Sequence, residues 1–371
     1  MKRWLHRLAR IFVAGFVLLL LAIAVEIALG WGCHLEGQVA APVTQPPERK
    51  ALTSGIKDYE RPEDDAYLSY PEWYIVWSYQ EKADYQQQRL PSGFPYFAAV
   101  RQYWNSYCCI SRLIRGKFGF NGGEQLMLVV IGTSFSAEYI LKGVYEKTIG
   151  RLSEWTSGHE PVEEDEYAYQ VARDYADFVH IRPFYEFRFA PRVKGVWADT
   201  HLWGAHPVRK WERTIFLTLD YGLEAFYCWV IEKLTHLTYG FEPTETFAWI
   251  ENAPEDLPRE LPRVKKVRDA GPRAMIVDIP RYQEFTSIAG ELARRNVNFV
   301  EIARNSHITL SVLAPREWRY GHGAAQALFS APILTQAGQK RVFLGCDVAA
   351  LSSVLNSLRA DGVVIEHVYD F

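Results

Sequence analysis

The chain has 371 residues, of which 49% are hydrophobic and 23% are charged. This composition is too apolar for a disordered chain, and the length exceeds that of one ordinary core, so we expect two folded units. The net charge of −3 provides no basic field that would attract nucleic acid, and we exclude nucleic acid as a partner.

An apolar run over residues 11–30 is the strongest signal in the sequence. At about 1.5 Å per helical residue it is about 30 Å long, which matches the hydrocarbon thickness of a bilayer. Trp4 and Trp31 bracket the run, and basic residues precede it. These are Lys2, Arg3, Arg7 and Arg10. The positive-inside rule then predicts a cytoplasmic N-terminus, an inner (plasma) membrane location and an extracytoplasmic bulk.

A cleaved signal peptide is the alternative interpretation of this run. The apolar region of a signal peptide spans about 7–15 residues and ends near a small-residue cleavage site. The nearest such site, at residues 39–41, lies well beyond the run. We therefore prefer a retained membrane anchor.

Composition along the rest of the chain suggests its division. We expect a cytoplasmic tip (1–10), the transmembrane helix (11–30), a proline-bearing stalk (31–66), a mainly helical, aromatic-rich, membrane-proximal domain (67–239), a Pro-rich linker (240–272) and a C-terminal α+β domain (273–371). Within the helical domain, residues 161–180 combine an acidic first turn with an apolar stripe, which predicts an amphipathic helix.

Two later segments, 126–141 and 214–231, are apolar enough to raise the question of further spans. The first contains Glu138, and the second contains Asp220 and Glu224. An acid at mid-membrane costs about 2.5–3.5 kcal/mol, whereas each Leu, Ile, Phe or Val returns only about 0.3–0.6 kcal/mol. We prefer buried helices, with Asp220 and Glu224 on an exposed face. The alternative is a three-pass topology in which the three acids mark an ion path.

The last hundred residues alternate between strand and helix patterns. Strand-like segments are expected at 274–279, 297–302, 308–313, 342–344 and 363–368, with helical stripes at 285–293 and 351–358. One sheet with both helices on one face, a ferredoxin-like βαββαβ variant, satisfies the rules of connection handedness and one-sided burial.

Motifs whose chemistry fixes their spacing are missing from the sequence, so no cofactor and no metal site is predicted. Weak catalytic candidates are the imidazoles and carboxylates that cluster around residues 177–206, because such groups exchange protons. They are Asp177, His180, Asp199, His201 and His206.

Residues 182–213 interleave cations with aromatic rings. Such amphipathic side chains favour a lipid headgroup layer. The predicted lipid-binding residues are Arg188, Arg192, Lys194, Trp197, Arg209, Lys210 and Trp211.

We therefore expect a membrane-anchored, non-enzymatic module that binds membrane lipid or an envelope protein partner at the membrane surface. The alternatives are a membrane enzyme that acts on a lipid or polymer through the histidine region, and a three-pass transport-related subunit.

Overall fold

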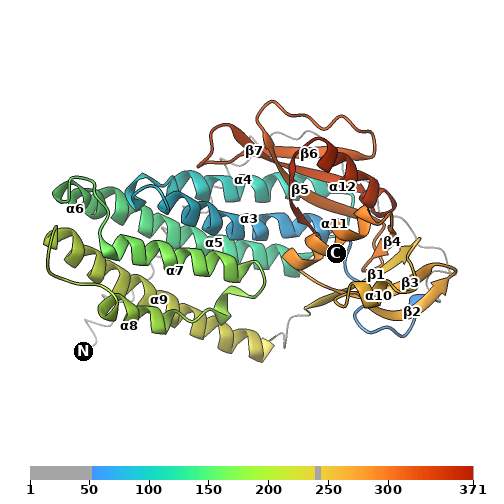
Figure 1. Ribbon diagram of the computed structural model, residues 1–371, viewed down its shortest axis with the longest axis horizontal. Helices are drawn as coiled ribbons and strands as arrows, with labels where there is room; N and C mark the ends of the chain where they lie inside the picture. The colour runs from blue at the N-terminus through green and yellow to red at the C-terminus, as the bar shows by residue number, and fades with distance from the viewer. Residues whose placement is uncertain (1–51, 239–243, 371) are drawn as a thin grey trace.

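The computed structural model describes residues 52–238 and 244–370. The predicted tip, transmembrane helix and most of the stalk lie outside the described residues. The described chain is α+β: a helical bundle precedes two four-stranded antiparallel sheets (Figure 1). The aromatic-rich helical region predicted from the sequence is confirmed.

The bundle contains seven α-helices within the described residues. They are α3 (Asp65–Gln86), α4 (Tyr96–Ile114), α5 (Gly122–Tyr145), α6 (Arg151–Thr156), α7 (Glu163–Val179), α8 (Phe189–Ala198) and α9 (Pro207–Thr238). A π-helical turn, Glu146–Gly150, joins α5 to α6, so the two helices follow one another as a single rod. The helix α7 confirms the amphipathic helix expected at 161–180.

Aromatic side chains fill the contact between α3, α4 and α5. Tyr103 and Trp104 are fully buried, yet their polar atoms are satisfied. The Tyr103 hydroxyl donates to the Leu128 carbonyl at 2.6 Å, and Trp104 Nε1 donates to Ser136 Oγ at 2.9 Å. Because a buried polar group without a partner is costly, these bonds fix the register of α4 against α5.

The C-terminal part consists of two consecutive units with the same order of strands and main helix, and the first unit has an additional short helix, α10. The first unit contains β1 (Glu245–Glu251), α10 (Leu257–Glu260), β2 (Lys265–Gly271), β3 (Ala274–Pro280), α11 (Gln283–Arg294) and β4 (Asn298–Ile302). The second contains β5 (His307–Pro315), β6 (Ala325–Pro332), β7 (Gln339–Asp347), α12 (Leu351–Ala360) and β8 (Val364–Val368). The sheet orders, β2-β3-β1-β4 and β6-β7-β5-β8, are equivalent. The chain therefore carries an internal βββαβ repeat.

This repeat corrects two expectations. The strands do not form the single ferredoxin-like sheet, because β4 pairs with β1 and β5 pairs with β7 and β8 in a second sheet. The expected Pro-rich linker over 240–272 is also wrong, since β1, α10 and β2 lie within it.

The two units share one hydrophobic core. The Val368 N–H of β8 donates to Thr286 Oγ1 of α11 at 2.9 Å. Reciprocally, Ser352 Oγ of α12 donates to the Val297 carbonyl beside β4 at 2.7 Å. Each helix is thus bonded to the end of the other unit's sheet.

Segments from the N-terminal side cover the other faces of the sheets. Tyr59, which is 2% exposed, donates its hydroxyl to Glu301 of β4. On the second sheet, Arg341 of β7 lies 4.3 Å from the ring centroid of Trp77 of α3. The end of the predicted stalk is therefore packed structure, and α3 links the bundle to the second sheet (Figure 1).

Candidate membrane-surface site and its ion-paired core

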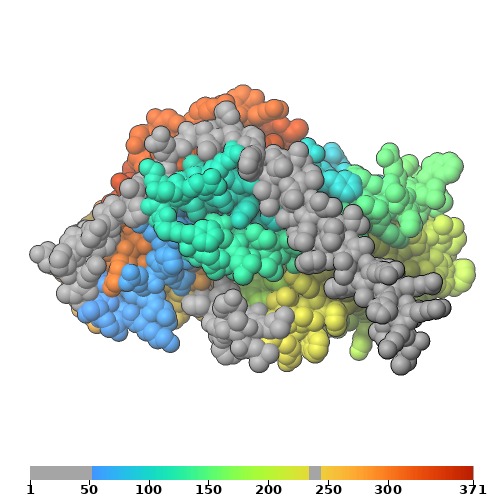
Figure 2. All heavy atoms as spheres, turned by 180° about the vertical axis from the view of Figure 1, so that it is seen from behind, coloured from blue at the N-terminus to red at the C-terminus, as the bar shows by residue number. Residues whose placement is uncertain are grey.

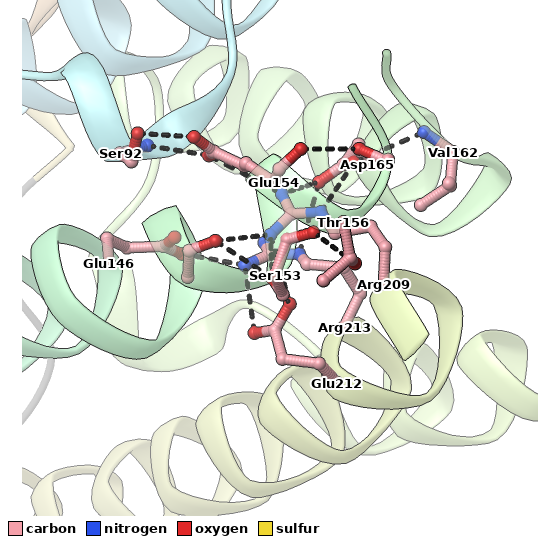
Figure 3. Close-up of polar contacts among 12 residues, drawn as sticks. Ser92, Glu146, Ser153, Glu154, Thr156, Val162, Asp165, Arg209, Glu212 and Arg213 are labelled. Carbon is pink, nitrogen blue, oxygen red and sulfur yellow. Dashed lines mark hydrogen bonds and ion pairs between the residues drawn. The ribbon is translucent and has the colours of Figure 1, made fainter. Parts of the chain in front are cut away.

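Arg209 of α9 is the centre of a buried ion-pair cluster that lies between α6, α7 and α9 (Figure 3). Its Nη2 lies 2.7 Å from Asp165 Oδ1, and its Nη1 lies 3.0 Å from Glu212 Oε2 and 2.7 Å from Ser153 Oγ. The Arg209 side chain is fully buried. A buried charge is stable only when it is paired and hydrogen-bonded, so these contacts fix α9 against α6 and α7.

One turn further along α9, Arg213 makes a second set of ion pairs. Its Nη1 lies 2.8 Å from Glu146 Oε1 of the π-helical turn, and its Nε lies 3.2 Å from Asp165 Oδ1. Figure 3 shows Arg209 and Arg213 pointing from the same helix toward these carboxylates. Asp165 therefore lies between two guanidinium groups.

Lys142 of α5 organises a third cluster. Its Nζ lies 2.8 Å from Glu138 Oε1, 3.1 Å from Asp220 Oδ1 and 3.1 Å from Glu224 Oε1. The expectation that Asp220 and Glu224 occupy an exposed face is therefore wrong, because both point inward to Lys142. A small cavity of about 50 Å³ is lined by this cluster and by Glu146 and Arg213.

The exposed part of the predicted basic and aromatic stretch lies on α8 and the loop that follows it, which runs from the C-terminal half of α7 back to its start. Arg188 and Lys194 are exposed, Trp197 is 49% exposed, and Trp203 is 74% exposed. Trp197 Nε1 donates to Thr218 Oγ1 of α9 at 2.9 Å, which holds the indole at the edge of the bundle. Trp203 packs edge-on against the half-buried Trp211.

Three of the predicted lipid-binding cations have other roles in the structure. Arg209 is buried in the cluster described above, and Lys210 is buried against Glu163 at 3.2 Å. Arg192 forms an ion pair with Asp174 at 2.8 Å. The prediction is therefore wrong for Arg209 and Lys210, because their charges are directed into the protein. Arg188 and Lys194 are the members that face solvent.

The histidine constellation expected from the sequence is not assembled. His180 lies at the C-terminal end of α7, where its Nδ1 lies 2.7 Å from the Ala176 carbonyl oxygen and its ring is edge-on to Trp73. His201 lies at the other end of α7, 3.0 Å from Glu163. Hydrogen bonds from His201 and Lys210 lower the pKa of Glu163 to about 2. His206 lies 3.5 Å from Glu160.

The carboxylates of that constellation are also apart. Asp177 pairs with Arg173 at 3.5 Å on the exposed side of α7, whereas Asp199 ends α8. Within residues 52–238 and 244–370, no three His, Cys, Asp or Glu side chains are placed to hold a metal ion. The structure thus places Asp177 and His180 toward one end of α7 and Asp199, His201 and His206 toward the other, so the five candidates do not form one site.

Sequence reasoning missed the paired cations of the core. The signal was present, because Glu138, Lys142 and Glu146 follow at intervals of four in an otherwise apolar helix. That spacing places all three on one helix face, as it does for Arg209 and Arg213 of α9. Comparison with known proteins identified no matching family model, curated protein or solved structure.

Proposed function

We propose that the chain is a membrane-anchored, non-enzymatic module that binds lipid at the surface of the inner membrane. In this proposal residues 11–30 span the bilayer with the N-terminus in the cytoplasm, and the described residues lie on the extracytoplasmic side. Two described helical segments, Gly122–Thr156 and Pro207–Lys233, are long and apolar enough to cross a membrane. This finding supports membrane association.

The observation that carries the proposal is the exposed group of cations and indoles on α8 and the loop after it. Arg188 directly precedes α8, Lys194 and Trp197 lie within it and Trp203 lies in the loop after it, and all four side chains are exposed. Each cation near an anionic surface contributes about 1 kcal/mol, and indoles prefer the headgroup layer, where one end is dry and the other wet. We therefore assign anionic headgroups as the ligand of this group.

The test uses the full chain in nanodiscs made either of phosphatidylcholine or of a mixture with phosphatidylglycerol. We expect amide hydrogen exchange over residues 188–204 to be slower in the anionic discs, and the Arg188→Gln/Lys194→Gln variant to lose this difference. A matched control is Arg316→Gln/Arg319→Gln, which removes two exposed cations from the β5–β6 connection. Equal exchange in both lipids would reject lipid binding and leave an envelope protein as the partner.

A further inference from the structure

The helices α5, α6 and α9 present apolar side chains to the outside, while most of their charged side chains point inward. On α5 and α6 the outward residues include Leu126, Val130, Leu141, Val144, Leu152 and Trp155, all more than half exposed. These positions contrast with Glu138, Lys142 and Glu146, which face the ion-paired core. The rod is therefore amphipathic in the opposite sense to a surface helix of a water-soluble bundle.

The helix α9 shows the same inversion over most of its length. Its outward residues recur every three to seven positions and are again more than half exposed: Val208, Ile215, Leu219, Leu223, Phe226 and Trp229. The charged residues Arg209, Arg213, Asp220 and Glu224 lie on the other side of the helix, in the core. In the segments Gly122–Thr156 and Pro207–Lys233, only 33% and 22% of the most apolar stretch is buried. Neither segment is therefore the buried core helix that we expected from the sequence.

The two inverted helices lie side by side and antiparallel. Tyr145 of α5 donates its hydroxyl to Glu212 near the start of α9, whereas Lys142, which precedes Tyr145, contacts Glu224 further along α9. Figure 1 shows α7 on the near side of the bundle, and Figure 2, from behind, shows α5 and part of α9 at the surface. Their apolar stripes therefore belong to one broad face.

Basic residues border this face and acids lie on the side of α7. Arg115 and Lys117 are exposed before α5, and Lys147 and Arg151 are exposed at its far end. By contrast, the exposed charged residues of α7 include the acids Glu166, Asp174 and Asp177 beside the single cation Arg173. The face is thus apolar at its centre and basic at its border, which complements a bilayer with anionic headgroups.

The apolar centre and basic border of this face also limit what can cover it. A single helix, as proposed for residues 11–30, would be about 10 Å wide and could not cover both stripes. A second copy would bring like-charged borders together. A crossing of the membrane by α5 and α9 would carry the charged side of α7, which packs against α9 and α3, into hydrocarbon, where ionised side chains are expensive.

We infer that the α5–α6–α9 face is inserted into the outer part of the bilayer, with the helices parallel to the membrane plane and α7 on the water side. This inference rests on the proposed lipid-binding function and extends it from headgroup contact to acyl-chain contact. The acyl layer covers the apolar side chains to a depth of about 5–10 Å, as for other interfacial helices. The ion-paired core then keeps the charges of α5 and α9 on the protein side.

The test places a bimane fluorophore on single introduced cysteines in the full chain, in vesicles of phosphatidylcholine and phosphatidylglycerol. The parent is Cys33→Ser, because Cys108, Cys109, Cys228 and Cys346 are buried. Labelling of the parent itself is the background measurement. The probed positions are Leu141→Cys on α5 and Leu219→Cys on α9, and the matched control is Gln170→Cys on the exposed side of α7.

We expect lipids brominated in the acyl chain to quench the probes at 141 and 219 at least threefold more than the probe at 170. Aqueous iodide should give the reverse order. Quenching of 141 and 219 by iodide to the same extent as 170 overturns the inference, and protection from both quenchers overturns it in favour of a protein cover. Either result can occur while the nanodisc exchange difference at 188–204 persists, so failure of the inference is distinguishable from failure of the proposed function.

A double variant on α9 distinguishes loss of membrane insertion from misfolding. Leu219→Glu/Leu223→Glu adds two charges at exposed positions, so the melting temperature in mild detergent should stay within a few degrees of the parent. In vesicles the same substitutions should at least halve bromolipid quenching at position 141. Unchanged quenching with an unchanged melting temperature contradicts insertion of α9.

Discussion

Arg209 Nη2 and Asp165 Oδ1 are 2.7 Å apart, and the Arg209 side chain has no exposed surface. A second arginine–aspartate pair, Arg173 with Asp84, has nearly the same separation of 2.8 Å, but its side chains are 44% and 41% exposed. The two pairs match in separation but differ in burial, and Arg209 also has Glu212 and Ser153 as partners. Their comparison therefore contrasts a buried ion-pair cluster with an exposed pair of the same length.

We predict that Arg209→Ala destabilises the folded state by about 3–5 kcal/mol, because it removes the closer of the two guanidinium partners of Asp165 and Glu212 inside a buried cluster. Arg173→Ala should cost less than about 1 kcal/mol, since water screens an exposed pair. Urea unfolding in mild detergent, followed by tryptophan fluorescence, measures both. Equal losses would show that the buried cluster does not stabilise the bundle.

Two helical glycines give opposite expectations for the same substitution. A Cβ added at Gly132 of α5 would lie 2.1 Å from the buried Tyr103 ring, whereas at Gly222 of α9 nothing lies within 4 Å. Gly132→Ala should cost about 1–3 kcal/mol through overpacking. Gly222→Ala should stabilise by about 0.5–1 kcal/mol, because alanine loses less backbone entropy in a helix. Melting temperatures in detergent that shift in the same direction would contradict the packing of α4 on α5.

His367 predicts a pH dependence of stability. Its ring is fully buried and stacks on Trp73 at 3.6 Å between centroids, and burial, with His180 and Arg281 nearby, holds the pKa of His367 well below its ordinary value. In the unfolded chain the imidazole takes up a proton near pH 6.5. The contribution of the neutral ring is therefore present above about pH 6.5 and is lost as pH falls, with a slope of up to about 1.4 kcal/mol per unit.

His367→Gln should flatten this dependence. The difference in unfolding free energy between pH 7.5 and pH 5.5 should shrink by about 1 kcal/mol or more relative to the parent. The exposed His322, which contacts Asp361, provides the control as His322→Gln. A slope that is unchanged in His367→Gln would mean that His367 is protonated in the folded protein.

Arg341 connects the bundle to the second sheet. It forms a two-point pair with Glu366, at 2.6 and 2.7 Å, reaches Glu81 of α3 at 3.2 Å and lies over Trp77. Arg341→Met should cost about 3–5 kcal/mol, because two buried carboxylates lose their partner. Arg341→Lys should recover only part of this loss, since an ammonium lacks the planar fork. Full recovery by lysine in urea unfolding would indicate that charge alone is required.

The sequence predicted those elements whose periodicity is visible within one segment. The acidic first turn and apolar stripe of 161–180 identified α7, and each later strand and helix expected after residue 273 corresponds to an observed element. The strand β2 was missed because it is an exposed edge strand whose residues, apart from a half-buried Ala270, show no apolar alternation. The pairing of the strands could not be predicted from the sequence either, since β1 and β4 are brought together only by the tertiary fold.

The candidate site was predicted in part for the same reason. Composition placed cations and indoles in one stretch, but it gave no information on which cations face carboxylates from distant helices. Arg209 meets Asp165 and Lys142 meets Asp220 across long sequence separations, so their burial depends on the packing of α5, α7 and α9. Arg188 and Lys194 remained exposed because α8 turns them away from that core.

The repeated βββαβ unit is not built to fold without its neighbour. Because α11 is hydrogen-bonded to β8 and α12 is bonded beside β4, neither unit completes its own interior. A fragment that ends after β4 would lack the contacts of α11 with α12 and β8. We expect such a fragment to associate with a copy of itself through this surface, because the region has the construction of two subunits joined in one polypeptide.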